Sequence, residues 1–581
     1  MTNLKTIRLE KILLFVWLLV NLGIGGLTVH QYGMSTDEPN NYRYAADTLA
    51  AYPSFFGTLY PPKYDSSYEG HGPAFVALVA ILIRIIQRVF PNVFTPDLWH
   101  FSYFTTLLLA GLCLYWLTKR WFSQWTAWGI LLLFNTQPLL LGHSFMNPKD
   151  IPFMSLLTLS IVLGFRLADN LGGIEPFVSL ERPTNIIVNK FRDTDPRRRK
   201  RFLISLTLAL AIVLFLVLFS SQVNSLTNQV VTFFYTASPD SWAGQIFGSV
   251  ARHADDVSAE DYAAKAWRLV QRLERAILIG GVLFFLAYFS LVISDTTFTA
   301  FLRNLWRQSH RLGQLIVNST NSSRISINLR SIKNWLAEIL HALTNSYVIL
   351  AGIALGLATA VRAIAPIAGV IVFLYLFIKV RSKAWTTGIA YFLVAAIVTY
   401  IAWPHLWGEP IQRYLHSLGI AANFHYYSGR VLFGGHFYGI TSLPHSYLPV
   451  LLSIQFTEPL ILGVYLGLGI LIWWLLRSRV RADLLLYIGL GFAFPLFALI
   501  GLNSPLYHNF RQTLFLIPAM VMLAAFPLEL VFSKLPQSWM RVLLIIAIAL
   551  PGVYSSVKLY PYEYVYYNSF VGGLADRKSV V

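Results

Sequence analysis

Long apolar stretches recur along almost the whole chain, and they constrain its fold more than any other feature. Each is close to the roughly 20 residues that a helix needs to cross a bilayer. Inside a bilayer the backbone polar groups must be satisfied within the protein, so such stretches fold as helices. We therefore predict an all-α polytopic membrane protein with about 13 transmembrane helices. The expected spans are residues 12–27, 103–117, 125–141, 151–167, 202–219, 276–293, 347–360, 364–377, 385–403, 459–476, 484–502, 514–530 and 542–553.

The positive charge of the chain is sorted by loop. Lys and Arg outnumber Asp and Glu by 45 to 27, which gives a formal net charge of +18. The basic residues crowd alternate loops, most densely at 197–201, and the positive-inside rule makes those loops cytoplasmic. We therefore expect a plasma (inner) membrane protein with a cytoplasmic N-terminus and an external C-terminus. The same sorting argues against nucleic acid as a partner and leaves membrane lipids as the expected surroundings.

One apolar stretch, residues 74–90, is expected to lie along the membrane surface instead of crossing it. Arg84 and Arg88 are four residues apart and flank Gln87, so they form a polar stripe on one helix face. An amphipathic helix of this kind sits at the interface. Counting it as a span would also place the basic residues at 197–201 outside the cell, against the positive-inside rule. The helix then belongs to a first external loop at 31–99, and further external loops are expected at 221–275 and 404–458.

Chemically informative residues gather in the loops and span ends that are expected to be external. Asp37 and Glu38 directly follow the first span, and ionised groups gain nothing beside lipid unless chemistry or a cation uses them. Because acids and arginines fall together at one membrane face, we predict an active site there. The other residues of interest are Tyr60, His71, Lys149, Asp150, Arg362, His508 and Arg511.

Structural explanations exist for the same residues. The acids at 37–38 could be solvated groups where a helix stops. Asp150 could cap the next span by its own side chain or through Asn147. Arg362 and Arg511 could be interfacial residues whose charged heads reach water.

Short motifs at fixed places relative to the spans carry a family resemblance. They are Asp37-Glu38, His71-Gly72-Pro73 at the start of the interfacial helix, the turn ending Lys149-Asp150, Gly356 followed by Arg362, and residues 507–511 and 561–568. With these motifs the chain resembles the family 39-type membrane glycosyltransferases of the GT-C fold, a group that includes protein O-mannosyltransferases and lipid A aminoarabinose transferases. The WWDYG motif of oligosaccharyltransferases is absent.

The resemblance implies a GT-C bundle whose external loops form the active site. It also implies a polyprenyl-phosphate-linked sugar as donor and a lipid, glycan or protein as acceptor. Cleaving the sugar–phosphate bond releases an anion that leaves readily, so cations are needed more than a general acid. One carboxylate then suffices to take the proton of the attacking hydroxyl.

We predict an inverting transferase in which Asp37 is the base. Glu38 is expected to orient Asp37 or to raise its pKa by like-charge repulsion. The expected donor-phosphate residues are Arg362, Arg511, Lys149 and His508, and the expected residues for acceptor binding or loop support are Asp150, His71 and Tyr60.

No compact ligand set predicts a cofactor, although Asp37, Glu38 and Asp150 could share a divalent cation. Cys113 is the single cysteine and lies inside a span, which excludes disulfides and zinc-ribbon sites. Glycine pairs at 352 and 356 and at 463 and 467 predict close helix packing. A flippase, or a ligase or transporter for lipid-linked saccharides, remains the alternative function, because it would share the substrate and the location.

The transmembrane catalytic domain is expected to cover residues 1–557. Residues 558–575 are expected to begin an external C-terminal segment that is truncated, since relatives with a similar Tyr-Tyr-Asn and Gly-Gly ending often continue into an external domain. Residues 576–581 can be back-translated into a common sequencing-adapter sequence, and we expect them to derive from one.

Overall fold

A computed structural model describes residues 2–57, 70–172, 229–230, 232–233, 241, 329–380, 383–422, 429–477, 480–502, 504–507 and 509–573. The expected spans 202–219 and 276–293 lie outside these residues, as does nearly all of the expected loop 221–275. Within the described parts, eight helices are long and apolar enough to cross a membrane. Helices α15 (Leu329–Leu343) and α16 (Ser346–Thr359) meet at a bend of 79°. If they are counted as one span, the number of candidate spans becomes nine. The chain is an all-α polytopic membrane protein, as predicted.

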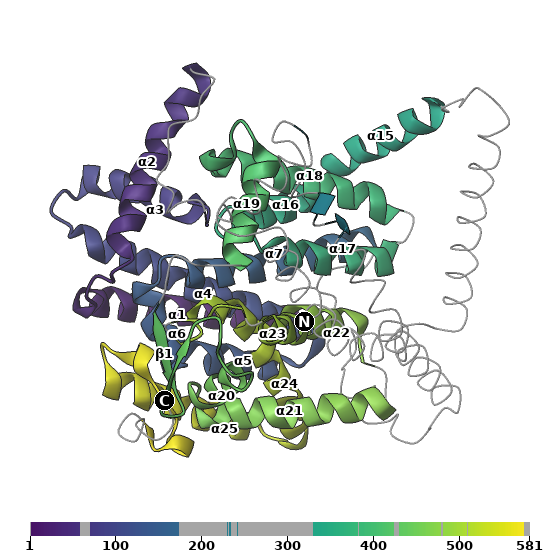
Figure 1. The fold of residues 1–581 in the computed structure, drawn as a ribbon. Helices are drawn as coiled ribbons and strands as arrows, with labels where there is room; N and C mark the ends of the chain where they lie inside the picture. The colour runs from purple at the N-terminus through teal and green to yellow at the C-terminus, as the bar shows by residue number, and fades with distance from the viewer. Residues whose placement is uncertain are drawn as a thin grey trace.

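The expected spans within the described residues each fall on a helix or a pair of helices, and these helices form a bundle (Figure 1). Besides α16, they are α1 (Thr2–Thr28), α4 (Thr95–Trp121), α5 (Gln124–Asn135) with α6 (Pro138–Met146), α7 (Asp150–Leu171), α17 (Pro366–Val380), α18 (Ala384–Ala402), α21 (Glu458–Arg477), α22 (Ala482–Ile488) with α23 (Phe494–Gly501), α24 (Ile517–Lys534) and α25 (Ser538–Leu559).

Shorter elements connect the long helices. They are η1 (Val29–Gln31), α2 (Glu38–Gly57), α3 (Ala74–Val89), η5 (Pro404–Leu406), α19 (Pro410–Ala422), α20 (Tyr447–Ile454), the π-helical turn η6 (Gly489–Ala493), and the 3-10 turns η7 (Arg511–Leu516), η8 (Glu563–Val565) and η9 (Ser569–Val571). The strands of the described residues form one antiparallel hairpin, β1 (Arg430–Phe433) with β2 (His436–Gly439). Its turn uses Gly434 and Gly435, both at positive φ, where glycine is favoured.

The expected span at 125–141 is not one continuous helix, because the helix breaks between α5 and α6. Pro138 lacks a backbone N–H and holds the preceding Gln137 in an extended conformation. The break is tied to α21, since the side-chain amide of Gln137 donates to Thr457 Oγ1 at 3.0 Å and accepts from the Thr457 N–H at 3.0 Å. The backbone N–H groups of Thr136 and Gln137 bond to the carbonyls of Leu132 and Phe134.

Helix packing in the bundle relies on glycine, as predicted from the spaced pairs. A Cβ at Gly352 or Gly356 of α16 would crowd Val394 or Val398 of α18. A Cβ at Gly463 of α21 would crowd Ala524 of α24, and one at Gly467 would overlap the backbone of Leu523. Small residues let these backbones approach closely, which increases van der Waals contact. This contact matters because the hydrophobic effect does not drive helices together within lipid.

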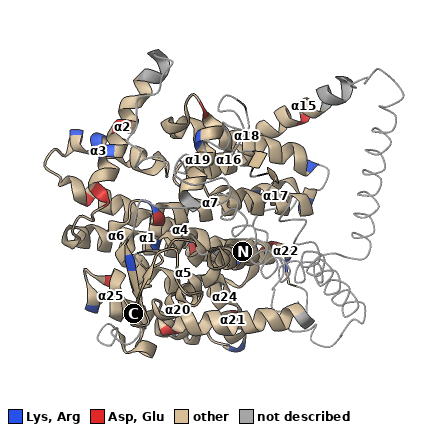
Figure 2. Ribbon diagram, viewed as in Figure 1, with Lys and Arg blue, Asp and Glu red and all other residues tan. Residues whose placement is uncertain are grey.

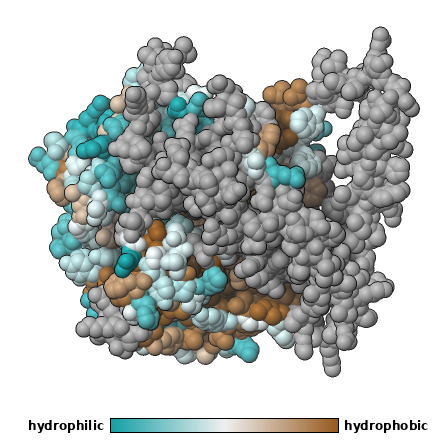
Figure 3. Space-filling view, in the orientation of Figure 1, coloured by the Kyte–Doolittle hydropathy of each residue, from teal (hydrophilic) through white to brown (hydrophobic). Residues whose placement is uncertain are grey.

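Charged residues are few along the bundle, and its outer surface is largely apolar around α21. Lys, Arg, Asp and Glu are sparse along the helices (Figure 2). On the face drawn in Figure 3, hydrophilic residues gather at the end where α2 and α3 lie, and hydrophobic residues cover the region of α21. Leu462 and Leu466 of α21 are 52% and 60% exposed. Such an apolar outer surface fits contact with lipid.

One end of the bundle is held by buried ion pairs between the ends of spans. Arg120 at the end of α4 pairs with Asp169 at the end of α7 and, at 2.8 Å, with Asp483 at the start of α22. Glu10, near the start of α1, pairs with Lys119 of α4. These pairs place the starts of α1 and α22 beside the ends of α4 and α7, as the alternating direction of the spans requires.

Helix α3 does not cross the bundle. Its first residues contact the turn after α16, and its side chain Gln87 donates to Thr95, where α4 begins, at 2.8 Å. Val79 and Ile83 are buried, whereas Leu82 and Val89 are exposed. The helix therefore has an apolar outer face at the same end of the bundle as the start of α4, which suits a position along the membrane surface.

Cysteine labelling tests the predicted orientation. In a Cys113→Ser background, Thr441→Cys should react with a membrane-impermeant maleimide in intact spheroplasts, whereas Ser538→Cys should react only after permeabilisation. Both positions are exposed in the structure, so accessibility depends on the side of the membrane. Labelling of position 538 but not 441 in intact cells would reverse the orientation.

Candidate active site

Charged residues from four distant segments meet at the other end of the bundle. Asp37 lies in the turn before α2, Lys149 and Asp150 lie where α7 begins, Arg362 lies between α16 and α17, and Arg511 begins η7. Lys149 interacts electrostatically with all four of the others. The structure thus brings together most of the residues that the sequence marked as candidates.

Two ion pairs join these segments. Arg511 Nη2 donates to Asp37 Oδ2 at 2.8 Å, and Arg362 Nη2 donates to Asp150 Oδ1. The Asp37 side chain is 34% exposed, while that of Asp150 is 5% exposed. Asp37 is therefore partly open to solvent, whereas Asp150 is buried against its arginine.

Asn147 fixes the start of α7. Its side-chain oxygen accepts the N–H of Asp150 at 2.9 Å and that of Lys149 at 3.2 Å. Its amide nitrogen donates to Asp150 Oδ2 at 3.1 Å. Asn147 therefore caps the helix, and Asp150 is held by this cap on one side and by Arg362 on the other.

Lys149 leaves the cluster with surplus positive charge. Among the described residues its ammonium group has no ion pair within 4 Å and no hydrogen bond. Burial lowers the pKa of Lys149 to about 8, with the attraction of Asp37 and Asp150 opposing the repulsion of the two arginines. Since this pKa lies above neutral, three cations face two carboxylates near pH 7.

The pKa of Asp37 lies below its usual value. Burial raises this pKa, but the charges of Lys149 and Arg511 and the hydrogen bond from Arg511 outweigh burial. Asp37 is therefore ionised near neutral pH and able to accept a proton. The acid that raises its pKa is Asp150.

The expectation that Glu38 raises the pKa of Asp37 is wrong. The Glu38 side chain is fully buried, and its Oε1 lies 2.9 Å from Nε2 of His100 on α4. Helix geometry explains the divergence, because adjacent residues at a helix start point in different directions. The carboxylate of Glu38 is thus turned into the protein, away from the charge cluster.

The sequence His71-Gly72-Pro73 lies against the turn that carries Arg362. The N–H of Gly72 donates to Val361 at 3.2 Å, and that of Ala74 donates to Ala360 at 3.0 Å. A side chain at position 72 would overlap the Ala360 carbonyl. Burial and the charges of Lys149 and Arg362 hold the pKa of His71 well below its usual value, so its imidazole is neutral.

The segment after α25 contacts the part of the chain that precedes Asp37, and sequence reasoning missed this contact. Glu563 accepts a 2.8 Å hydrogen bond from Tyr32, five residues before Asp37. Asn568 donates to the carbonyl groups of Ser453 and Phe456 at 2.9 and 3.0 Å. The signal was present in the run 561–568, where Glu and Asn stand among aromatic residues, but the partners are far away in sequence.

Glu38 does not join the cluster. Tyr60 and His508 lie outside the described residues. Within the described ranges no group of three or more His, Cys, Asp and Glu could hold a metal ion. Because Glu38 is directed toward His100, the acids at 37, 38 and 150 do not form a shared ligand set, and we derive no step through a metal.

Comparisons with known proteins give one structural likeness. No protein-family model matches the chain, and the comparison with curated proteins finds no significant match. The fold is similar to that of the archaeal oligosaccharyltransferase AglB from Archaeoglobus fulgidus, solved in complex with an inhibitory peptide and a dolichol-phosphate. The two chains are 15% identical with a TM-score of 0.36, and the match covers 95% of this chain. It covers 56% of AglB, so this chain spans little more than half of that protein.

Gly72→Ala tests the contact that positions Arg362. The added methyl group must displace the backbone of Ala360, and overpacking of this kind costs about 1–3 kcal/mol. We expect a clear fall in the apparent Tm of the detergent-solubilised protein. Gly33→Ala is the matched control, since a Cβ there meets nothing within 4 Å. Equal Tm values for the two variants would contradict the close approach.

Proposed function

We propose that the chain is an inverting glycosyltransferase that moves a sugar from a polyprenyl-phosphate-linked donor to an acceptor at the external membrane face. The observation that carries this proposal is the cluster of three cations and two carboxylates at one end of the bundle. A cluster with surplus positive charge suits an anionic ligand, and an exposed carboxylate beside it suits proton transfer from an acceptor hydroxyl.

The cations suit the donor phosphate. Lys149 has no ion pair among the described residues and offers a point charge. Arg362 and Arg511 each use one nitrogen on a carboxylate, and a guanidinium has five N–H donors, so others remain for phosphate oxygens. Charge preorganised in this way stabilises the phosphate more as the glycosidic bond breaks.

Asp37 suits the role of general base. Its side chain is 34% exposed, and Lys149 and Arg511 keep its pKa low. As an acceptor hydroxyl attacks the anomeric carbon, its proton passes to the Asp37 carboxylate. The new carbon–oxygen bond forms as the carbon–oxygen bond to phosphate breaks, and polyprenyl phosphate leaves with the bonding electrons. A single displacement inverts the anomeric carbon and needs one carboxylate.

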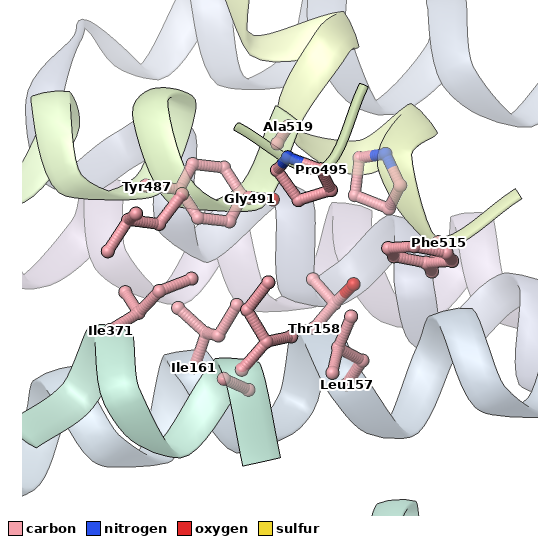
Figure 4. Close-up of a pocket in the computed structure, with 13 residues that line it drawn as sticks. Leu157, Thr158, Ile161, Ile371, Tyr487, Gly491, Pro495, Phe515 and Ala519 are labelled. Carbon is pink, nitrogen blue, oxygen red and sulfur yellow. The ribbon is translucent and has the colours of Figure 1, made fainter. Parts of the chain in front are cut away.

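A narrow apolar groove lies between the helices that follow the charged residues. Its walls are helices α7, α17 and α24 with the segment from α22 to α23 (Figure 4). Its cavity volume is about 10 Å³, which is room for about one water molecule. Leu157 lies two turns after Asp150 on α7, and Phe515 lies about one turn after Arg511. The segments that carry the charges thus also line the groove.

Asp37→Asn should abolish transfer while leaving membrane insertion and apparent Tm close to wild type, because it removes the proton acceptor with little change in volume. The assay is turnover of a polyprenyl-phosphate sugar by purified protein. Asp47→Asn, an exposed acid on α2, is the matched control and should keep wild-type turnover. Wild-type turnover by Asp37→Asn would rule out Asp37 as the base.

Arg511→Ala separates a transferase from a flippase for lipid-linked saccharides. In a transferase the arginine helps most in the transition state, so turnover should fall on the order of 10²-fold, with a smaller loss of donor binding. Arg511→Lys should recover part of the rate, because lysine restores charge without the planar fork. Arg430→Ala, an exposed arginine of β1, is the control.

The readout is release of polyprenyl phosphate from a radiolabelled donor in proteoliposomes supplied with periplasmic extract. A transferase releases it, whereas a flippase moves the intact lipid and releases none. Protein-dependent movement of the head group without release, across several donor sugars, would favour the flippase.

A further inference from the structure

The turn that carries Asp37 is closed by Glu38. The N–H of Ser35 donates to Glu38 Oε2 at 2.7 Å, and the N–H of Glu38 donates to the Ser35 carbonyl at 3.1 Å. This is the glutamate half of a capping box, in which the side chain returns to a backbone N–H three residues earlier. Asp37 lies inside this loop, and its carbonyl accepts the N–H of Asn41 at 3.2 Å. The position of Asp37 therefore depends on where the Glu38 carboxylate is held.

His100 lies against the other oxygen of that carboxylate, in a close contact whose angles are not those of a hydrogen bond. Nε2 of His100 lies 2.9 Å from Glu38 Oε1, and both side chains are fully buried. No Lys or Arg of the described residues lies within 4 Å of Glu38. Tyr42, one turn after Glu38 on α2, stacks on Trp99, which directly precedes His100 on α4, with ring centroids 4.6 Å apart. A buried carboxylate without a compensating charge is costly, and His100 is the basic side chain that lies against Glu38 among the described residues.

We propose that His100 is a positioning residue for Asp37. His100 on α4 anchors Glu38, Glu38 closes the turn, and the turn presents Asp37 to the charge cluster. The proposal rests on the function proposed above, in which Asp37 is the base. Neither His100 nor Glu38 is exposed, so both act through Asp37 and do not touch the substrate. The chain before the turn is held separately, by the hydrogen bond from Tyr32 to Glu563.

Two substitutions of similar size separate positioning from packing. His100→Leu removes the polar ring that lies against Glu38, and His100→Gln keeps a polar group near the position of Nε2. We expect His100→Leu to lower kcat on the order of 10²-fold with a much smaller change in donor KM, since a base displaced by about 1 Å can cost that much. His100→Gln should recover most of the rate. Equal kcat values for both variants, or a loss confined to donor KM, would overturn the proposal.

A double variant covers the case in which His100→Leu folds poorly. Glu38→Gln removes the buried charge, so Glu38→Gln with His100→Leu leaves no uncompensated carboxylate. If the two residues act on one another, His100→Leu should cost less in the Glu38→Gln background than in the wild type. Equal fold losses in both backgrounds would contradict the coupling.

A measurement without turnover separates failure of this proposal from failure of the proposed function. A nitroxide label on Thr36→Cys, an exposed residue of the turn, in a Cys113→Ser background reports local motion by its EPR line shape. His100→Leu should make the label more mobile, and His100→Gln should keep the wild-type spectrum. Unchanged spectra in both would show that the turn does not depend on His100, whether or not the wild type transfers sugar.

Discussion

The cost of burying charge is the constraint on which the rest of this structure depends. An unpaired charge in a lipid or protein interior is unfavourable by several kcal/mol. Buried arginines and acids of the described residues accordingly pair where spans begin and end, such as Arg120 with Asp169 and Asp483. Both of these pairs join spans that are distant in sequence. The pairs therefore fix the relative height of the helices as well as neutralise charge.

The two ends of the bundle use the same groups differently. At one end Arg120 and Arg481 face Asp169 and Asp483, the charges balance, and Tyr375 completes the network by bonding both Arg120 and Asp169. Such a network stabilises helix packing and leaves no charge for a ligand. At the other end Lys149 adds a cation without an ion pair in the described residues, and Asp37 is partly exposed. An excess of positive charge and an exposed carboxylate would be costly in a purely structural network. Both suit the binding of an anionic ligand.

Backbone contacts give the candidate site its precision. The hydrogen bonds of Gly72 and Ala74 bring α3 to the Arg362 turn, Asn147 sets the start of α7, and Glu38 closes the turn of Asp37. None of these contacts involves a group proposed to react. They hold loop residues to helix ends, which are more rigid than loops.

The sequence by itself determined the helical membrane fold, because span length and apolar composition depend on local chain properties. It also predicted that Asp37, Lys149, Asp150, Arg362 and Arg511 share one face, because span parity follows from counting. Only the tertiary structure decided which acid meets which arginine, that Glu38 is directed toward His100, and that α5 and α6 are separate helices. The hydrogen bond from Tyr32 to Glu563, in the distant run 561–568, was likewise decided by the tertiary structure. Pairing across tens to hundreds of residues depends on how helices rotate and pack, and no local pattern encodes that rotation.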